Sequence, residues 1–289
     1  MISHIVALVG ITFLAAVVNG GLGYGFSSIT VPLALLFLSN RTLNPALVLI
    51  EVALNAYVLF VNRDALGGVW RRMLPIVVAL LPGVIVGTLI VSRVSPAWVK
   101  LITYVLLLPL ILLQAAGFRR PIRSERAIGV PFGLGLGVLY SVTTISGPPL
   151  AVLLNNQGLS KREFRAAISF IRLAESSFTA VAYLAAGLMT RESNLLIPQI
   201  VPSVLIGVPL GAALIRRLDV ETFRRICMSF DAWIVGFGVS TVIKDIYRVP
   251  GAAPYSFLFG VALVDAVLLY RFFAGPKRGR PVEPFGQGT

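Results

Sequence analysis

Residues 20–32 read GGLGYGFSSITVP and interrupt a long apolar segment near the amino terminus. A second interruption, TTISGPP at residues 143–149, divides a later apolar segment. Stretches so rich in glycine and proline are poor continuous helices. Non-helical backbone is not tolerated where it faces lipid, so in a membrane protein each interruption must be buried in protein or line a cavity. The two stretches therefore predict two broken helices.

The composition excludes a water-soluble domain. The chain has 289 residues, of which 57% are hydrophobic and 13% charged, and its mean hydropathy is +0.88. Soluble domains carry about 25% charged residues. The single cysteine and single histidine exclude a disulfide framework and argue against a metal site. No metalloprotease, serine-hydrolase or P-loop motif is present. We therefore expect neither an enzyme nor a cofactor.

Apolar stretches of about 20 residues, each long enough to cross a bilayer, follow one another with short breaks. The continuous spans are predicted at residues 45–62, 73–91, 98–116, 166–188, 195–215, 222–243 and 255–274. The two interrupted regions, 3–38 and 128–154, are each predicted to enter and leave on the same side as a re-entrant hairpin.

Short sequence features of the first half recur in the second half. Pro32-Leu33-Ala34 recurs as Pro149-Leu150-Ala151. Four further residues recur 124 positions later; these pairs are Gly83 and Gly207, Gly87 and Gly211, Arg93 and Arg217, and Lys100 and Arg224. A duplicated membrane unit inserted in both senses is a common plan for secondary transporters. These four glycines, together with Gly133, Gly135 and Gly137, are expected to pack helices closely, and a homodimer face is the alternative use for such motifs.

Loop charges set the predicted orientation. With both hairpins re-entrant, eighteen Lys and Arg residues fall on one side and six on the other. The basic side is cytoplasmic by the positive-inside rule, so the amino terminus lies outside and the carboxyl tail inside. The net charge of +13 is thereby explained by membrane topology, and no nucleic-acid partner is expected.

The predicted fold is an all-α polytopic membrane protein, an inverted repeat of one broken hairpin plus three transmembrane helices per half, with one extra C-terminal helix. Its parts are residues 1–116 as the first repeat, 117–127 as a basic cytoplasmic linker, 128–243 as the second repeat, 255–274 as the extra helix and 275–289 as a disordered cytoplasmic tail.

Hydroxyl groups cluster at the two interruptions. A helix that begins at a break exposes free backbone N–H groups and its positive dipole end. Two such starts, one from each half, are expected to meet near the membrane midplane and bind an anion. The residues predicted to bind it are Gly21, Gly23, Tyr24, Gly25, Ser27, Ser28, Thr143, Thr144, Ser146, Gly147 and Pro148.

With these glycine and proline motifs spaced about 117 residues apart, the sequence resembles the TauE/SafE family of sulfite and organosulfur-anion exporters over residues 5–245. The resemblance implies transport of sulfite, a sulfonate or a related small anion across a bacterial cytoplasmic membrane. It also implies that Gly21, Gly23, Gly25, Pro32 and residues 147–149 correspond to the family's repeated motif.

Charged residues inside apolar spans usually mark function. Arg172 lies about 10 Å into its helix, and its guanidinium suits an oxyanion. We predict that Arg172 contacts the substrate. The alternatives are an ion pair with Glu175 or with an acid on another helix, or snorkelling to the interface. The inverted symmetry makes Glu51 one such acid.

Four residues are candidates for coupling or ion pairing, namely Glu51, Asn55, Glu175 and Asp231. A carboxylate among them that carries a proton allows proton-coupled movement. A proton- or cation-coupled permease for another small solute is therefore the competing function. An accessory subunit that moves nothing by itself is a third.

Overall fold

The computed structural model describes residues 2–22, 24–115, 125–154, 159–214, 220–249 and 251–274. All regular structure within these ranges is helical, which confirms the predicted all-α class. The elements are α1 (Ile2–Leu22), α2 (Phe26–Ala34), α3 (Asn40–Val61), α4 (Arg63–Leu66), α5 (Trp70–Arg93), α6 (Pro96–Ala115), α7 (Glu125–Thr143), α8 (Gly147–Leu154), α9 (Lys161–Ala185), α10 (Arg191–Leu214), α11 (Val220–Tyr247), a 3-10 turn η2 (Ala253–Tyr255) and α12 (Ser256–Ala274).

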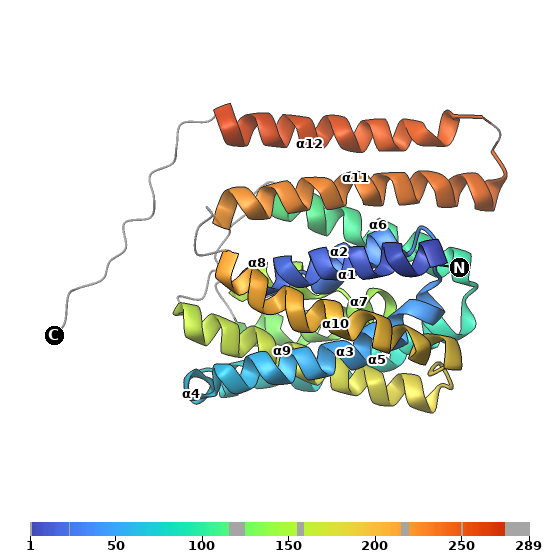
Figure 1. The fold of residues 1–289 in the computed structure, drawn as a ribbon. Helices are drawn as coiled ribbons and strands as arrows, with labels where there is room; N and C mark the ends of the chain where they lie inside the picture. The colour runs from blue at the N-terminus through green and yellow to red at the C-terminus, as the bar shows by residue number, and fades with distance from the viewer. Residues whose placement is uncertain are drawn as a thin grey trace.

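The long helices run side by side along one direction (Figure 1). Five of them are long and apolar enough to cross a membrane, counted over the described residues. They are His4–Gly21, Asn40–Val61, Trp70–Arg93, Arg191–Leu214 and Ala253–Arg271, and shorter apolar helices occupy Pro96–Pro109 and Gly129–Thr143. The many large hydrophobic side chains that remain exposed on these helices fit a lipid-facing surface.

The first interruption forms a hairpin. α1 ends at Leu22, and α2 begins after Gly25, whose φ of 109° is in the left-handed region that glycine adopts most easily. The chain then returns to the end of the bundle at which it began, because the His4 and Phe37 ring centroids lie 5.3 Å apart. Both ends of this region therefore lie at the same end of the bundle, while α1 by itself is long and apolar enough to cross a membrane.

The second interruption is built in the same way. α7 ends at Thr143, Thr144 takes a φ of 57°, and α8 begins at Gly147. The hairpin starts beside the beginning of α5, since Gly129 lies against Pro75 and Ile76.

The next helix, α9, also begins at the end of the bundle where α5 begins. Gly68, just before α5, faces the Glu163 carboxylate in the first turn of α9. At the opposite end, the Arg41 guanidinium at the start of α3 binds the carbonyls of Val91, Ser92 and Val94, where α5 ends. The two hairpins therefore open at opposite ends of the bundle.

Close glycine contacts join the broken helices to their neighbours. A Cβ on Gly83 or Gly87 of α5 would collide with α7, and one on Gly207 or Gly211 of α10 would collide with α1. Gly133 and Gly137 of α7 face α5 equally closely. The predicted packing role is thus confirmed for these residues. It is wrong for Gly135, whose Cβ would meet nothing within 4 Å.

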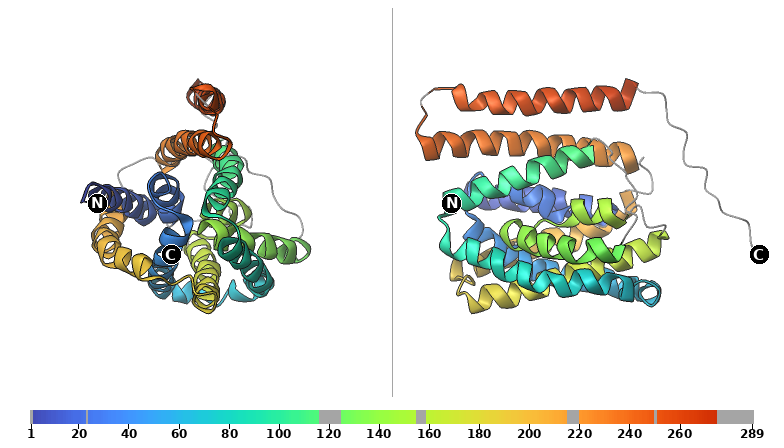
Figure 2. Two further views of the ribbon diagram at one scale, coloured as in Figure 1. Left: turned by 90° about the vertical axis from the view of Figure 1, so that its right-hand side faces the viewer. Right: turned by 180° about the vertical axis from the view of Figure 1, so that it is seen from behind.

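The last helix stands apart from the rest of the bundle and packs on α11 (Figure 2). Asp265 of α12 joins the two helices, because its carboxylate accepts hydrogen bonds from Ser229 Oγ and Trp233 Nε1, both at 2.9 Å. A buried acid in α12 is therefore a structural link to α11. The predicted tail, 275–289, and most of the predicted linker, 117–127, lie outside the described residues.

Candidate functional site

The two interruptions meet inside the bundle. Tyr24, at the first break, is buried, and a Cβ built on Gly147, at the second break, would lie 3.1 Å from Cδ2 of its ring. A side chain at this position would press on the aromatic ring, so glycine suits the close approach of α8. The structure thus brings together two predicted site residues that are 123 positions apart in the sequence.

Each break also supplies a serine to a buried acid on the helix that follows. Ser27 Oγ donates to Glu51 Oε1 at 2.5 Å, and Ser146 Oγ donates to Glu175 Oε2 at 2.5 Å. All four side chains are buried. The two acids are separated by 124 residues (175 − 51), the same distance that relates the repeated glycines. The site therefore contains two equivalent serine–carboxylate pairs, one from each half of the chain.

One buried arginine forms an ion pair with one of these two acids. Arg172 Nη2 lies 2.6 Å from Glu51 Oε1, and the side chains of both residues are almost completely buried, at 3% and 0% exposure. Burial excludes the snorkelling alternative for Arg172. The ion pair is made with the acid on another helix and not with Glu175 one turn along α9. Arg172 Nε has no hydrogen-bond partner.

Sequence reasoning missed Tyr140, which completes the environment of Glu51. Its hydroxyl, in the last turn of α7, donates to Glu51 Oε2 at 2.6 Å. Together with Ser27 and Arg172, it gives the Glu51 carboxylate three donors from three different helices. Glu175 has only Ser146, and its Oε1 has no partner. The two equivalent acids are therefore bound unequally.

Unpartnered polar groups continue one turn beyond each acid. Asn55 Nδ2 and Thr179 Oγ1 are buried and make no hydrogen bond. They are also 124 residues apart (179 − 55), so each follows its acid by four positions. These groups and Arg172 Nε belong to α3 and α9, which pack against each other. Thr179 was missed by the sequence analysis, although the repeat distance applied to Asn55 identifies it.

The remaining predicted site residues divide into two groups. Gly21, Gly25 and Ser28 are buried at the first break. At the second, the Thr143 hydroxyl donates to Leu139 O and accepts from the Ile145 amide, while the Thr144 hydroxyl donates to Thr143 O, so both hydroxyls stabilise the break itself. Gly23 and the side chain of Pro148 lie outside the described residues.

Asp231 is not brought to this cluster. It is fully buried in α11, and neither carboxylate oxygen has a hydrogen-bond partner. Its helix, α11, packs mainly on α6 and α12, whereas Glu51 and Arg172 lie on α3 and α9.

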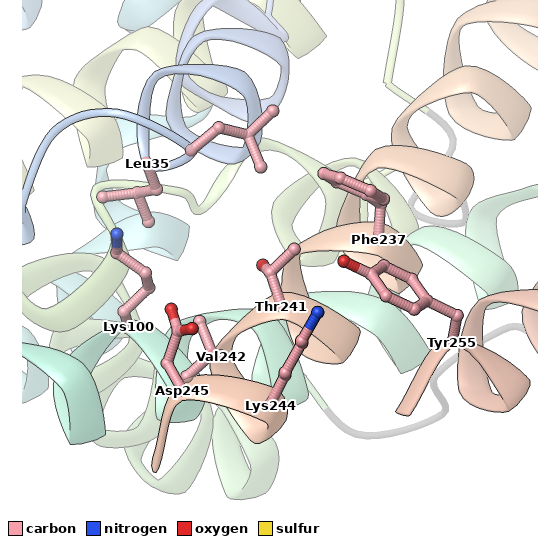
Figure 3. A pocket seen from close by; sticks show the side chains of 9 residues that line it. Leu35, Lys100, Phe237, Thr241, Val242, Lys244, Asp245 and Tyr255 are labelled. Carbon is pink, nitrogen blue, oxygen red and sulfur yellow. The ribbon is translucent and has the colours of Figure 1, made fainter. Parts of the chain in front are cut away.

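A separate cavity of about 350 Å³ opens where α11 ends and α6 begins (Figure 3). Lys100, Lys244 and Asp245 line it, with the hydroxyl groups of Thr241 and Tyr255. It contains none of the predicted site residues. No group of three or more histidine, cysteine or acidic side chains suited to a metal occurs in the described part of the chain.

A bundle of apolar helices with two interrupted hairpins and a buried, charged centre defines a multi-pass membrane protein. The family model for sulfite exporter TauE/SafE matches residues 8–238, so the chain belongs to the TauE/SafE family. The members of this family are transporters, and the family implies export of sulfite or a related organosulfur anion. No curated protein and no solved structure matches the chain.

Proposed function

We propose that the protein is a secondary transporter that moves a small anion, sulfite or a related organosulfur anion, by alternating access. Its binding site is the cluster around Arg172, where the two broken helices meet. The observation that carries this proposal is a buried guanidinium with an unpartnered Nε between two serine–carboxylate pairs. Unpartnered buried donors are costly unless a ligand satisfies them.

The donors around the cluster suit an oxyanion. Arg172 Nε and Asn55 Nδ2 have protons to donate and no acceptor, and the Thr179 hydroxyl is equally free. A tetrahedral or pyramidal anion such as a sulfonate or sulfite presents three oxygen atoms to such donors. Backbone N–H groups at the start of α2 and α8 add the positive ends of two helix dipoles. We assign the role of principal cation to Arg172.

An inverted repeat is supported by the way in which the helices pack. Several of the observed helix pairs are converted into one another when α1 is exchanged with α7, α2 with α8, α3 with α9, α5 with α10 and α6 with α11. Under this exchange the pair α1–α10 becomes α7–α5, the pair α2–α11 becomes α8–α6, and the pairs α3–α9 and α6–α11 map onto themselves. Two halves related in this way have two equivalent arrangements around one site, which is the basis of alternating access.

The orientation that we propose follows from the loop charges, with the amino terminus outside, the carboxyl tail in the cytoplasm and the chain in a bacterial cytoplasmic membrane. A potential of 100 mV, negative inside, then favours outward movement of each negative charge by about 2.3 kcal/mol. Export of an anion needs no ATP in such a membrane. The glycines at the α5–α7 and α1–α10 contacts are used within the chain, so a homodimer would need other faces.

The first experiment is flux of radiolabelled sulfite into proteoliposomes that hold only the purified chain, with and without a pH gradient. We expect saturable uptake that is lost in Arg172→Gln. Arg191→Gln is the matched control, because Arg191 is exposed at the start of α10. Normal transport by Arg172→Gln would disprove the anion site.

A proton- or cation-coupled permease for a different solute is the second candidate. It is favoured by Asp231, a buried acid with two unpartnered oxygens. In that case Asp231→Asn abolishes transport while Arg172→Gln preserves it. If the purified chain moves no solute under any gradient, the accessory-subunit alternative gains support instead.

A further inference from the structure

We propose that the transported anion and Glu51 compete for Arg172, and that the anion binds together with one proton, which Glu51 takes up. The inference rests on the anion-transporter function proposed above and names its coupling ion. It starts from an imbalance, since the cluster contains two buried acids and one buried base.

The anion cannot simply join the ion pair. Arg172 Nη2 is already bound to Glu51 Oε1 at 2.6 Å, and the pair is closed to solvent. An anion that binds the guanidinium beside an ionised Glu51 adds a second negative charge in a buried site, where like charges repel strongly. An anion that displaces Glu51 leaves that carboxylate buried without its cation, which is also costly. A proton on Glu51 removes both penalties.

The other two partners of Glu51 suit this change of protonation state. Ser27 and Tyr140 bind the carboxylate through hydroxyl groups, which can donate to an ionised acid and accept from a protonated one. Glu51 therefore keeps its hydrogen bonds after it loses Arg172. The titratable groups that face it are Arg172 and Glu175 from α9 and Tyr140 from α7. Arg172 stays charged throughout, so the proton belongs to an acid.

The net charge moved in each transport cycle follows from the binding of one proton with each anion. A monovalent sulfonate carried with one proton moves no net charge, so the membrane potential does not act on it. A pH gradient drives it toward the more alkaline side. A divalent anion such as sulfite carried with one proton still moves one negative charge. The potential then still drives the divalent anion outward, and transport remains compatible with export.

The test measures the affinity of the purified full-length chain for radiolabelled sulfite and methanesulfonate as a function of pH. Methanesulfonate stays ionised at every pH used, and the protonation of sulfite itself affects all variants equally. In the alkaline range, one linked proton makes the affinity of the wild type fall by about tenfold for each unit of rising pH. We expect Glu51→Gln to lack this additional fall. Glu192→Gln, at an exposed acid, is the matched control and keeps the wild-type slope.

Three outcomes overturn the inference. Equal pH profiles for the wild type and Glu51→Gln show that Glu51 takes up no proton. A profile flattened by Glu175→Gln instead assigns the proton to the other acid. Failure of the wild type to bind or transport either anion removes the proposed function itself, and the coupling with it.

Should Glu51→Gln not fold, calorimetry of methanesulfonate binding to the wild type, in buffers of different ionisation heat, gives the proton count directly. A count near one supports the proposal and a count near zero rejects it.

Discussion

Glu51 and Arg172 form a buried ion pair that joins α3 to α9, with 2.6 Å between Oε1 and Nη2. The two residues are 121 positions apart, and each belongs to a different half of the chain. The pair is also connected to both broken hairpins, because Glu51 accepts hydrogen bonds from Ser27 of the first and from Tyr140 of the second.

Loss of either partner of this pair should destabilise the protein. Removing one member of a buried ion pair leaves an uncompensated charge and costs about 3–5 kcal/mol. We expect Arg172→Gln to lower the midpoint of thermal unfolding in detergent markedly. The double variant Glu51→Gln with Arg172→Gln should lose less than the sum of the single changes, because neither charge remains. Additive losses would show that the two side chains do not interact.

Anions should rescue the variant that lacks Glu51. In Glu51→Gln the guanidinium has lost its competing carboxylate, so a bound anion replaces the missing charge. Binding stabilises the folded state in proportion to affinity. We expect methanesulfonate to raise the unfolding midpoint of Glu51→Gln more than that of the wild type, in a thermal-shift assay at one pH. An equal shift in both proteins would contradict competition for Arg172.

Two glycines of α7 should respond oppositely to the same change. A methyl group at Gly137 would meet the Leu80 carbonyl and the Val84 amide of α5, and overpacking of this kind costs about 1–3 kcal/mol. Gly135 faces no atom within 4 Å. There, alanine should be neutral or stabilise the helix by up to about 1 kcal/mol. Thermal unfolding of Gly137→Ala and Gly135→Ala makes the comparison, and equal midpoints would mean that α5 and α7 are not in close contact.

Backbone conformation alone should decide the effect of Gly25→Ala. Its Cβ would make only an ordinary contact, 3.5 Å from Val18 Cγ1, but its φ of 109° disfavours any side chain. We expect a loss of about 1–2 kcal/mol. Gly10→Ala is the control, since Gly10 lies in α1 with open space around it. A loss of stability at Gly10 as large as that at Gly25 would refute the conformational explanation.

The link between α11 and α12 should be separable from transport. Asp265→Ala leaves Ser229 Oγ and Trp233 Nε1 without their acceptor, which costs about 1–3 kcal/mol. α12 lies beyond residue 238, where the family match ends. We expect faster proteolysis between α11 and α12 in Asp265→Ala, with sulfite flux retained. Loss of flux in a correctly folded variant would place α12 in the transport machinery.

Local sequence features predicted most of the fold. Every predicted span corresponds to a helix, and both interruptions are breaks between helices. The repeat distance of 124 identified glycines that do pack on the broken helices, and it relates Glu51 to Glu175 and Asn55 to Thr179 as well. These features are readable because hydropathy, helix breakers and duplication are properties of the chain itself.

The sequence did not indicate which side chains within the site bind each other. Arg172 has an acid three residues away on its own helix, yet it binds Glu51 from α3. Tyr140 carried no signal in the sequence, and it binds the same acid.

The sequence by itself determined that the chain enters the membrane, where its helices are interrupted and which residues carry charge inside it. Only the tertiary structure decided that Tyr24 meets Gly147 and that Glu51, not Glu175, holds Arg172. The physical reason is that hydropathy and helix propensity act over neighbouring residues. The partner of a buried charge depends instead on how distant helices are rotated and packed against each other.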